Sequence, residues 1–556
     1  MNRLATVAHP LGWAHGTRLK RWRQCAAVLV LLVLASACGG PREPTLAFPR
    51  GTAFLGAVAG DEPRAALVAR GVLAAGGNAA DAAVALYFTA AVTYPAAASL
   101  GGGGVCLVYD PSTDTTEALD FLPDAPAGDP VPGTWAAAVP GAVRGMYALN
   151  ARYGRFRWGR LLAPAELNAR FGHPVSRALA RRLAEAGPRL LEEPDLARLF
   201  GRGREGPVRE GENLVQLDLA ALLARVRARG PGEFYTGALA RSFVDGVRTA
   251  GGWLTIDDLR AYRPRWRETV SMRFGSARLH TAPPPALGGI TALQIWRMLA
   301  QGKRYRRASP DERPHLLAEA AMRAFTDRTA WLPPGDREAE PPDDVLSEAR
   351  AARLMASYRP DRRTPAPSTA PPAAALEGAS EAMAFVVVDR EGSAVVCVVS
   401  LFEPFGAGRM ARGTGILLAG APGTAGRDPA PLAAVLMVNH NTRQGVFAAA
   451  ASGGAPAAAS LAATMVQILV DERPLAPAVA APRLHRGGLP DVVLVEPEMG
   501  ERGLAQLAAR GHVVQRSPLL GRVHAIHCPE GLKSSPESCS FTADPRGFGL
   551  ATAGGF

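Results

Sequence analysis

The sequence predicts a mixed protein of helices and strands in which the sheets are stacked in layers. Segments with the 3.6-residue period of helices alternate in blocks with short apolar runs that are typical of strands, and no internal repeat is present. Of the 556 residues, 48% are hydrophobic and 20% are charged. This composition is typical of an ordered globular protein with a large core, and alternating blocks of helix and strand favour layered packing.

The first part of the chain is predicted to be mainly helical. The segment "RAALVARGVLAAGGNAADAAVALYFTAAV" indicates two helices divided at Gly76–Gly77, because glycine suits a helix C-terminus. The run "GGGGVCLVYD" then indicates a glycine turn into a strand, and it lacks the GK[ST] that a phosphate loop needs. In "GGWLTIDDLRAYRP" we expect a helix capped near Thr255. Asp257 and Asp258 would lie in its first turn, where carboxylates favour the helix dipole.

A break in the pattern divides the chain. Residues 359–379, "RPDRRTPAPSTAPPAAALEGA", are rich in proline and small residues without a period, which predicts a flexible loop. Apolar runs beyond it predict strands at 383–388, 394–400, 433–438 and 445–451, and a helix from Ala457 to Val470.

The charge pattern argues against nucleic acid as a partner. The formal net charge is +12. The basic residues are scattered singly among acids, without like-charged blocks or interleaved aromatic residues. We therefore expect an ordinary solvated surface.

The N-terminus has the pattern of an export signal at residues 1–37. Basic residues precede the short apolar run "AAVLVLLVLASAC", which is too short to span a bilayer. Its end resembles a bacterial lipoprotein box, which predicts a lipid on Cys38 and a tether over 38–54. Ordinary cleavage after Ala37 is the alternative. Lipidation would hold the protein at a membrane surface, periplasmic or on the cell surface.

The remaining cysteines are expected to play two roles. Cys106 and Cys397 lie in apolar runs and are predicted to be buried small residues. Cys528 and Cys539 flank the turn-rich "PEGLKSSPES" and are predicted to form a disulfide if the protein is exported.

Several long blocks, in order, resemble the gamma-glutamyltranspeptidases. They include "GGNAADAAVAL", "GPGEFYTGALARSFVDGVRTAGGWLTIDDLRAYRPRWRETVS", "PPPALGGITALQI" and "RGTGILL", and the resemblance covers roughly residues 55 to 553. It implies an α+β protein with the N-terminal nucleophile hydrolase fold, a four-layer αββα sandwich with two stacked antiparallel sheets. A large-subunit-like region would span 55–358 and a small-subunit-like region 380–556.

The resemblance also implies the chemistry that should occur. In the family a precursor cuts itself before a threonine, whose freed amine then activates its hydroxyl against a gamma-glutamyl amide. Counted back from "VVVD", the threonine position falls on Ala382, and the next two positions fall on Met383 and Ala384. Because a methyl group cannot attack a carbonyl, we expect no self-cleavage and no acyl-enzyme.

The substrate-binding positions implied by the resemblance have changed as well. The carboxylate-binding arginine falls on Leu122, the supporting threonine and asparagine on Ser400 and Phe402, and the serine pair on Ala433 and Ala434. The acidic position after "GTGILL" has no acid in "AGAPGTAG". Gly453 and Gly454 match the glycine pair of the oxyanion site, although glycines are equally suited to a turn. We therefore expect a catalytically inactive protein with a binding or structural role and a more apolar pocket.

Two further groups of residues suggest other chemistries. Ser380 lies two residues before Ala382 and would share its face on a strand, so cleavage before Ser380 could create an alternative N-terminal nucleophile. His524, His527 and Cys528 could suggest a metal site, but the two histidines should face opposite sides of a strand. We expect no metal and no cofactor. The ligand, a small molecule or a protein, stays unknown.

Overall fold

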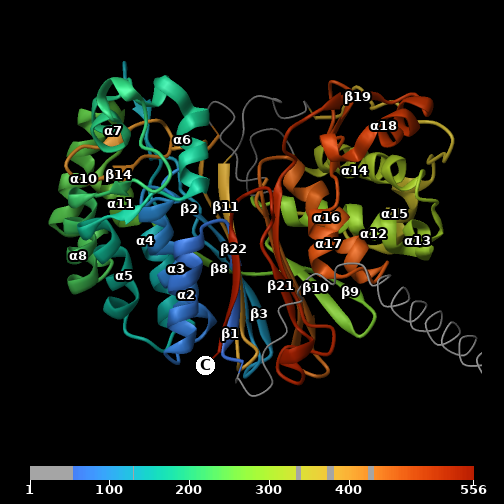
Figure 1. The fold of residues 1–556 in the computed structure, drawn as a ribbon, viewed down its shortest axis with the longest axis horizontal. Coiled ribbons are helices and arrows are strands. Elements are labelled where there is room, and N and C mark those ends of the chain that lie inside the picture. The colour runs from blue at the N-terminus through green and yellow to red at the C-terminus, as the bar shows by residue number, and fades with distance from the viewer. Residues whose placement is uncertain (1–53, 129–130, 333–339, 372–380, 424–430, 556) are drawn as a thin grey trace, which may run out of the picture. The chain divides into compact units, whose positions relative to one another are not determined.

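Two wholly antiparallel sheets lie face to face, and helices cover the outer side of each (Figure 1). The computed structural model describes residues 54–128, 131–332, 340–371, 381–423 and 431–555. The first sheet has the order β22-β1-β11-β12-β2-β3-β8, and the second has the order β21-β20-β16-β15-β10-β9. This is the four-layer αββα sandwich that the sequence predicts.

The strands of both sheets come from the two halves of the chain. The first sheet contains β1 (Gly56–Gly60), β2 (Gly103–Asp110), β3 (Thr115–Asp120), β8 (Arg265–Glu268), β11 (Glu381–Asp389), β12 (Ala394–Phe402) and β22 (Leu550–Gly554). The second contains β9 (Val270–Phe274), β10 (Ala277–Thr281), β15 (Ala433–Asn439), β16 (Gln444–Ser452), β20 (Arg522–His527) and β21 (Ser540–Thr542). Short strands form small sheets outside them: β4 (Trp135–Ala136), β5 (His173–Pro174), β6 (Asn213–Leu214), β7 (Gly252–Trp253), β13 (Met410–Ala411), β14 (Ile416–Leu417), β17 (Leu484–His485), β18 (Val492–Val495) and β19 (Val513–Arg516).

The helices fall into two groups, one for each sheet. Those on the side of the first sheet are α2 (Pro63–Ala74), α3 (Ala79–Thr93), α4 (Ala142–Tyr153), α5 (Trp158–Phe171), α6 (Arg177–Leu190), α7 (Pro194–Phe200), α8 (Leu217–Arg229), α9 (Gly232–Tyr235), α10 (Ala238–Thr249) and α11 (Ile256–Ala261). Those on the side of the second are α12 (Gly288–Ala300), α13 (Arg304–Arg307), α14 (Arg313–Trp331), α15 (Glu348–Met355), α16 (Pro456–Leu469), α17 (Leu475–Ala480) and α18 (Gly500–Ala509).

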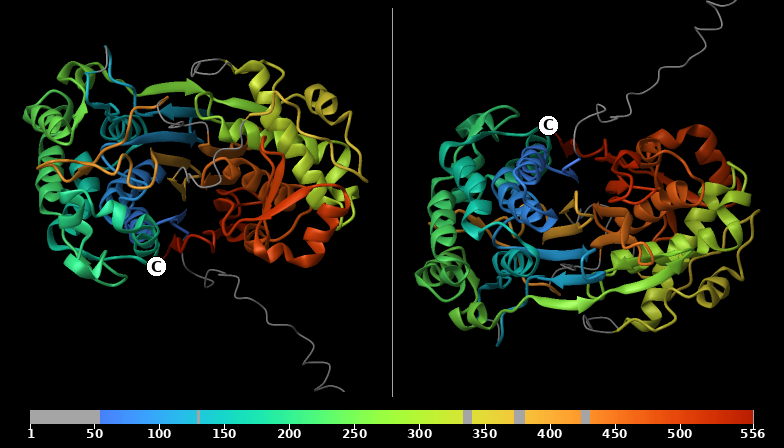
Figure 2. Two further views of the ribbon diagram at one scale, coloured as in Figure 1. Left: turned by 90° about the horizontal axis from the view of Figure 1, so that it is seen from above. Right: turned by 90° about the horizontal axis from the view of Figure 1, so that it is seen from below.

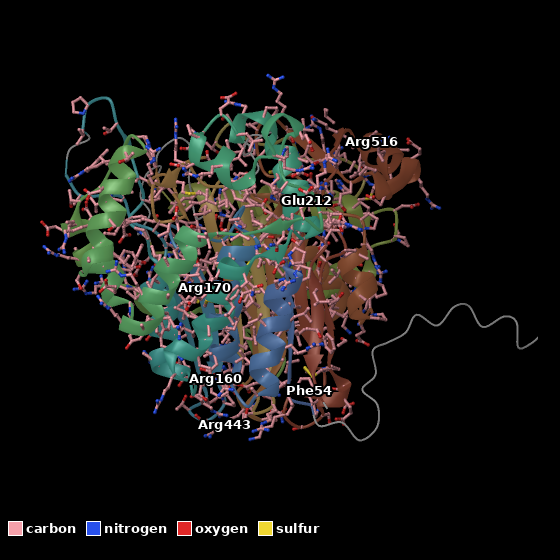
Figure 3. All side chains as sticks on the ribbon, turned by 60° about the vertical axis from the view of Figure 1, so that its left-hand side comes forward. Phe54, Arg160, Arg170, Glu212, Arg443 and Arg516 are labelled. Carbon is pink, nitrogen blue, oxygen red and sulfur yellow. A yellow bond between two sulfur atoms is a disulfide. The ribbon has the colours of Figure 1, made fainter. Side chains whose placement is uncertain are left out.

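Between β8 and β9 the chain crosses from the first sheet to the second with almost no connecting loop. Only Thr269 separates β8, at the edge of the first sheet, from β9 in the second, and both strands are green in Figure 2. The two ends of the described chain also meet, because β1 pairs with β22 just after Phe54, which is labelled in Figure 3.

Strand β11 is apolar on both faces because both faces are buried. Met383, Phe385 and Val387 pack toward the helices of the first sheet, while Ala384 and Val386 pack between the sheets. A strand with two buried faces has a continuous apolar run instead of an alternating one. The predicted strand at 383–388 therefore stands out in the sequence, and the structure extends it by two residues at its start and one at its end.

The other predicted elements lie close to their expected positions. The remaining strands predicted after the proline-rich segment correspond to β12, β15 and β16, and the predicted helix to α16. Thr255 caps α11 in a reciprocal arrangement in which its hydroxyl accepts from the Asp258 N–H and Asp258 accepts from the Thr255 N–H. Asp257 instead pairs with Arg260 at the surface.

The proline-rich segment is irregular but well anchored where it is described. Residues 359–371 contain no helix or strand. Arg363 nevertheless ion-pairs with Asp491, and the Pro371 carbonyl accepts from the Leu489 N–H at 2.9 Å. The predicted export signal, Cys38 and Ser380 lie outside the described residues. None of the described helices is both long and apolar enough to cross a membrane.

Candidate functional site

The position predicted for a nucleophile is buried between the two sheets. Ala382 is the second residue of β11, faces Ser400 of β12 across the strand pair, and is 3% exposed. Its methyl group belongs to an apolar cluster between the sheets that also contains Leu122 and Ala434. Ala384, another changed position, lies in the same cluster. The structure thus brings four of the changed positions together, but as hydrophobic packing.

The other changed positions lie apart from that cluster. Met383 and Phe402 pack on the helix side of the first sheet, and Ala433 packs on the helix side of the second. Ser400 is buried, and its hydroxyl donates to the Glu381 carbonyl at 2.6 Å and accepts from the Phe402 N–H at 2.7 Å. Its hydrogen bonds therefore serve the backbone of β11 and β12.

The glycine pair lies near the start of β11 and has a backbone that favours glycine. Gly453 and Gly454 have φ angles of +106° and +73° and connect β16 to α16. A Cβ on Gly453 would lie 2.8 Å from the Cα of Gly521. The neighbouring Ser452 hydroxyl donates at 3.2 Å to the Asp61 Oδ2 that also accepts from the Ala384 N–H. The pair is therefore close to the predicted site, but backbone geometry alone accounts for both glycines.

A buried ionic cluster surrounds the residue before Ala382. Its members are Asp61, Arg182, Glu381, Arg522 and His524, and we call them the Asp61 cluster. Arg522 lies 2.8 Å from Asp61 through Nε and 2.7 Å from Glu381 through Nη2, and its Nη2 also donates to the Ala382 carbonyl at 3.1 Å. Arg182 holds the other Glu381 oxygen at 2.9 Å. Two carboxylates thus face two guanidinium groups, which is how charges are tolerated in an interior.

The charges of the Asp61 cluster stabilise one another. Burial alone would raise the pKa of Asp61. The interactions with Arg522 and His524 together outweigh this effect, so the pKa of Asp61 lies below its usual value. Burial disfavours the charged form of Arg522, but the facing carboxylates of Asp61 and Glu381 hold its pKa well above the usual value. His524 Nε2 lies 3.0 Å from Asp61, and its Nδ1 accepts from the Asp544 N–H at 3.2 Å.

Sequence reasoning missed the Asp61 cluster, although one signal pointed to it. Glu381 begins the apolar run "EAMAFVVVD", and Arg522 and His524 lie in "RVHAIHC". Charged side chains inside apolar strands are almost never fully buried unless they are paired. That rule predicts partners for these residues but does not identify them.

A second feature beside the apolar cluster is a charged cavity of about 160 Å³. Leu122 lines it together with Asp120, Tyr262, Arg263, Arg265 and Arg267. Five of its lining side chains are charged: Asp120, Asp124, Arg263, Arg265 and Arg267. The prediction of a substrate pocket more apolar than the family's stays a prediction. The three arginines were missed although "RPRWR" places them at every second position, the spacing that puts side chains on one face of a strand.

The described residues contain one group with the spacing of metal ligands. His315, Glu319 and His512 have ligand atoms within 4.8 Å of one another. Arg323 and Arg486 each bind a Glu319 oxygen at 2.5 Å, so two cations already neutralise this carboxylate. His315 Nδ1 and His512 Nε2 are 2.8 Å apart and hydrogen-bonded to each other. The group therefore fits a buried polar network better than a metal site.

The other suspected metal ligands are separated in the structure. His524 is opposite Ala450 between the sheets, whereas His527 is opposite Phe447 on the helix side of the second sheet. Cys528 is in a disulfide and is not available as a thiolate ligand.

Cysteines of the described residues form two disulfides, one of which the sequence did not predict. Cys528 and Cys539 are joined, as predicted from the loop between them. Cys106 and Cys397 are also joined, so the prediction that they are merely buried small residues was wrong. They lie directly opposite each other on β2 and β12. The physical reason is this register, which brings together residues 291 apart in sequence.

The stacked antiparallel sheets between helical layers define the N-terminal nucleophile hydrolase class of fold. Among solved structures, cephalosporin acylase from Bacillus halodurans superposes with a TM-score of 0.75 at 22% identity, over 92% of this chain and 99% of that one. Gamma-glutamyltranspeptidase from Helicobacter pylori superposes with a TM-score of 0.51 at 31% identity, over 55% of this chain and 92% of that one.

The family model described as "Gamma-glutamyltranspeptidase" matches residues 65–421 and 425–553. The chain belongs to the gamma-glutamyltranspeptidase family. It is 29% identical to the glutathione hydrolase proenzyme of Escherichia coli, over 90% of this chain and 92% of that protein. It is likewise 29% identical to glutathione hydrolase 7 of Homo sapiens, over 84% of this chain and 75% of that protein.

Proposed function

We propose that this member of the family stays a single uncut chain and neither transfers nor hydrolyses gamma-glutamyl groups. The observation that carries the proposal is Ala382, a buried methyl group at the position where the family resemblance puts the nucleophile. Neither self-cleavage nor acyl transfer can begin there without a hydroxyl or thiol.

The surroundings of Glu381 support an uncut chain. Its carboxylate is held by Arg182 and Arg522, and its carbonyl accepts from Ser400. Cleavage after Glu381 would create a carboxylate and an ammonium group in a cluster whose charges already balance. Burying further charges without partners costs several kcal/mol per ion in practice, by order of magnitude, so the intact peptide is favoured.

A binding or structural role fits what the chain keeps and what it has changed. The sandwich keeps three large clusters of buried apolar side chains, which support the fold. The positions for substrate binding carry apolar residues such as Leu122, Phe402 and Ala434. The retained scaffold would then act by binding a small molecule or a protein.

We also propose that the protein is exported and anchored through a lipid on Cys38. The N-terminal pattern supports export, and so do the disulfides Cys106–Cys397 and Cys528–Cys539, because disulfides persist mainly in oxidising compartments. Labelling cells with an alkyne fatty acid should tag the wild type and leave Cys38→Ser untagged. A tag on both variants, or on neither, would contradict the anchor.

The decisive experiment measures intact mass and turnover of the purified chain. We expect a single mass with no internal break, and no release of the aniline from a gamma-glutamyl anilide. The Escherichia coli relative serves as the positive control. Ala382→Thr tests whether one hydroxyl suffices, and we expect it to stay uncut because Met383, Ala384 and Leu122 also differ from the family pattern.

A break near residue 380 would overturn this proposal. Two fragments with a new N-terminal Ser380, together with turnover that Ser380→Ala abolishes, would identify an active amidohydrolase whose nucleophile lies two residues earlier.

A further inference from the structure

The charged cavity beside Leu122 lies at the edge of the first sheet. It is formed where β3 ends, by Asp120 and Leu122, and where the chain enters β8, by Tyr262 and the three arginines at 263, 265 and 267. Ligand pockets for drug-sized molecules are about 300–1,000 Å³. A cavity of about 160 Å³ therefore suits only a small ligand.

Strand geometry explains why the arginines gather there. Arg265 and Arg267 are two apart on β8, so their side chains share a face, while Trp266 between them packs toward the core. Arg265 is directly opposite Asp120 in the neighbouring strand β3. The two strands thus build the cavity from backbone that the sheet holds in place.

The lining of the cavity has an excess of positive charge. Three arginines face two carboxylates, Asp120 and Asp124. One Asp120 oxygen accepts from the Leu122 N–H at 3.0 Å, so part of its acceptor capacity is used by the backbone. An additional negative charge would balance the lining.

Arg267 is positioned to bind such a charge. Its Nη1 donates to the Pro284 carbonyl and lies 3.9 Å from an Asp120 oxygen. Both contacts use the same nitrogen, and a guanidinium has five N–H groups in a planar fork that matches carboxylate and phosphate oxygens. The side chain is 28% exposed, so a ligand from solvent can reach it.

We infer that this cavity binds a small anion with a carboxylate or phosphate group, held by Arg267 and the adjacent arginines. Leu122 and Tyr262 form an apolar wall for a short carbon chain. The inference rests on the proposed binding role and gives it a ligand class. The arginines of this cavity lie on β8 and just before it, whereas the family resemblance puts its carboxylate-binding arginine at Leu122, which here forms part of the wall.

The test is titration of the full-length chain with succinate, glutarate and inorganic phosphate by calorimetry. We expect at least one anion to bind at low ionic strength, and to bind more weakly with added sodium chloride because salt screens the interaction. Binding of the dicarboxylates alone would identify an organic acid as the ligand class, and binding of phosphate alone a phosphate group. Lack of binding by all three would overturn the inference.

Variants locate the site. Arg267→Gln should weaken binding about tenfold or more, since charge-assisted hydrogen bonds are worth roughly 1.5–3 kcal/mol. Arg267→Lys should restore part of the lost affinity because it keeps the charge without the planar fork.

The matched control is Arg273→Gln, because Arg273 is an exposed arginine on β9. Equal affinity in wild type and Arg267→Gln would overturn the inference. Circular dichroism checks folding, and exposed Arg263→Gln offers a second variant should Arg267→Gln misfold.

The two proposals can fail separately. An uncut, inactive chain that binds no anion would refute only the cavity. A cleaved, active chain would refute the proposed function, while the effect of Arg267→Gln on anion binding could still be measured.

Discussion

Arg522 lies 2.8 Å from Asp61 in an ion pair whose side chains are both at most 2% exposed. Asp61 follows β1 in the first sheet, and Arg522 begins β20 in the second, so the pair joins the two sheets. Through Nη2 the same guanidinium reaches Glu381 at the start of β11. The Arg522 side chain therefore links the two sheets at the end of the sandwich where the family resemblance puts catalysis.

Removing Arg522 should be strongly destabilising. Arg522→Ala leaves Asp61 and Glu381 buried with fewer cationic partners, and breaking a buried pair in this way costs about 3–5 kcal/mol. Urea unfolding followed by circular dichroism measures the change. The control is Arg516→Ala, because Arg516 (labelled in Figure 3) pairs with Glu501 while both are more than half exposed. Exposed pairs contribute about 0–1 kcal/mol, and equal losses in the two variants would contradict the role of the cluster.

Gly453 should contribute to stability, whether or not it has a catalytic role. Gly453→Ala introduces a Cβ 2.8 Å from the Gly521 Cα at a φ of +106°, and strained backbone of this kind costs about 1–3 kcal/mol. Thermal unfolding should show the loss. Gly445→Ala, in the same strand β16, meets no described atom within 4 Å and should have a much smaller effect. A neutral Gly453→Ala would show that backbone geometry does not explain the glycine.

The two disulfides should differ in their contribution to stability. If a disulfide acts by restricting the unfolded chain, closing 291 residues stabilises by more than closing 11. The chain-entropy relation gives about 5–6 kcal/mol for the first and about 3 kcal/mol for the second. Urea unfolding of Cys106→Ala/Cys397→Ala and of Cys528→Ala/Cys539→Ala compares them. A larger loss from the second pair would contradict this ordering.

The local features of the fold could be predicted because short-range chemistry determines them. The apolar run of β11 is buried on both faces, and Thr255 with Asp258 forms a cap within one helical turn. Cys528 and Cys539 could be paired because only a short loop separates them. In each case the partners are near in sequence or the pattern lies within one element.

The long-range features could not be predicted for the opposite reason. The bond between Cys106 and Cys397 depends on the register of β2 with β12, and the pair of Asp61 with Arg522 depends on how the two sheets stack. The arginines at 263, 265 and 267 were visible as a pattern, but the cavity exists only because β3 and β8 are neighbours. The position of Ala382 follows from a resemblance, and only the fold shows that its methyl group is buried in an apolar cluster next to a buried ionic one.

His485 should make the protein sensitive to mild acid. It is 4% exposed in β17, and burial, with Arg328 nearby, lowers its pKa from 6.5 to about 4. The unfolded chain therefore binds a proton between about pH 6.5 and 4 that the folded chain does not. Stability is full above the unfolded pKa and is lost as the pH falls through that window. One such proton contributes a slope of about 1.4 kcal/mol per pH unit.

His485→Leu removes this proton while keeping an apolar side chain against the Phe325 ring, which His485 contacts at 5.1 Å between centroids. Urea unfolding at several pH values should give a fall in unfolding free energy that is shallower than in the wild type by about 1.4 kcal/mol per pH unit. His280 and His512, whose pKa values burial lowers to about 3 and about 4, keep part of the wild-type slope. The two proteins are compared by the slope of unfolding free energy against pH. The change in packing alters the unfolding free energy by the same amount at every pH, so it leaves this slope unchanged. Parallel curves for the two proteins would mean that His485 takes up a proton equally well when the chain is folded.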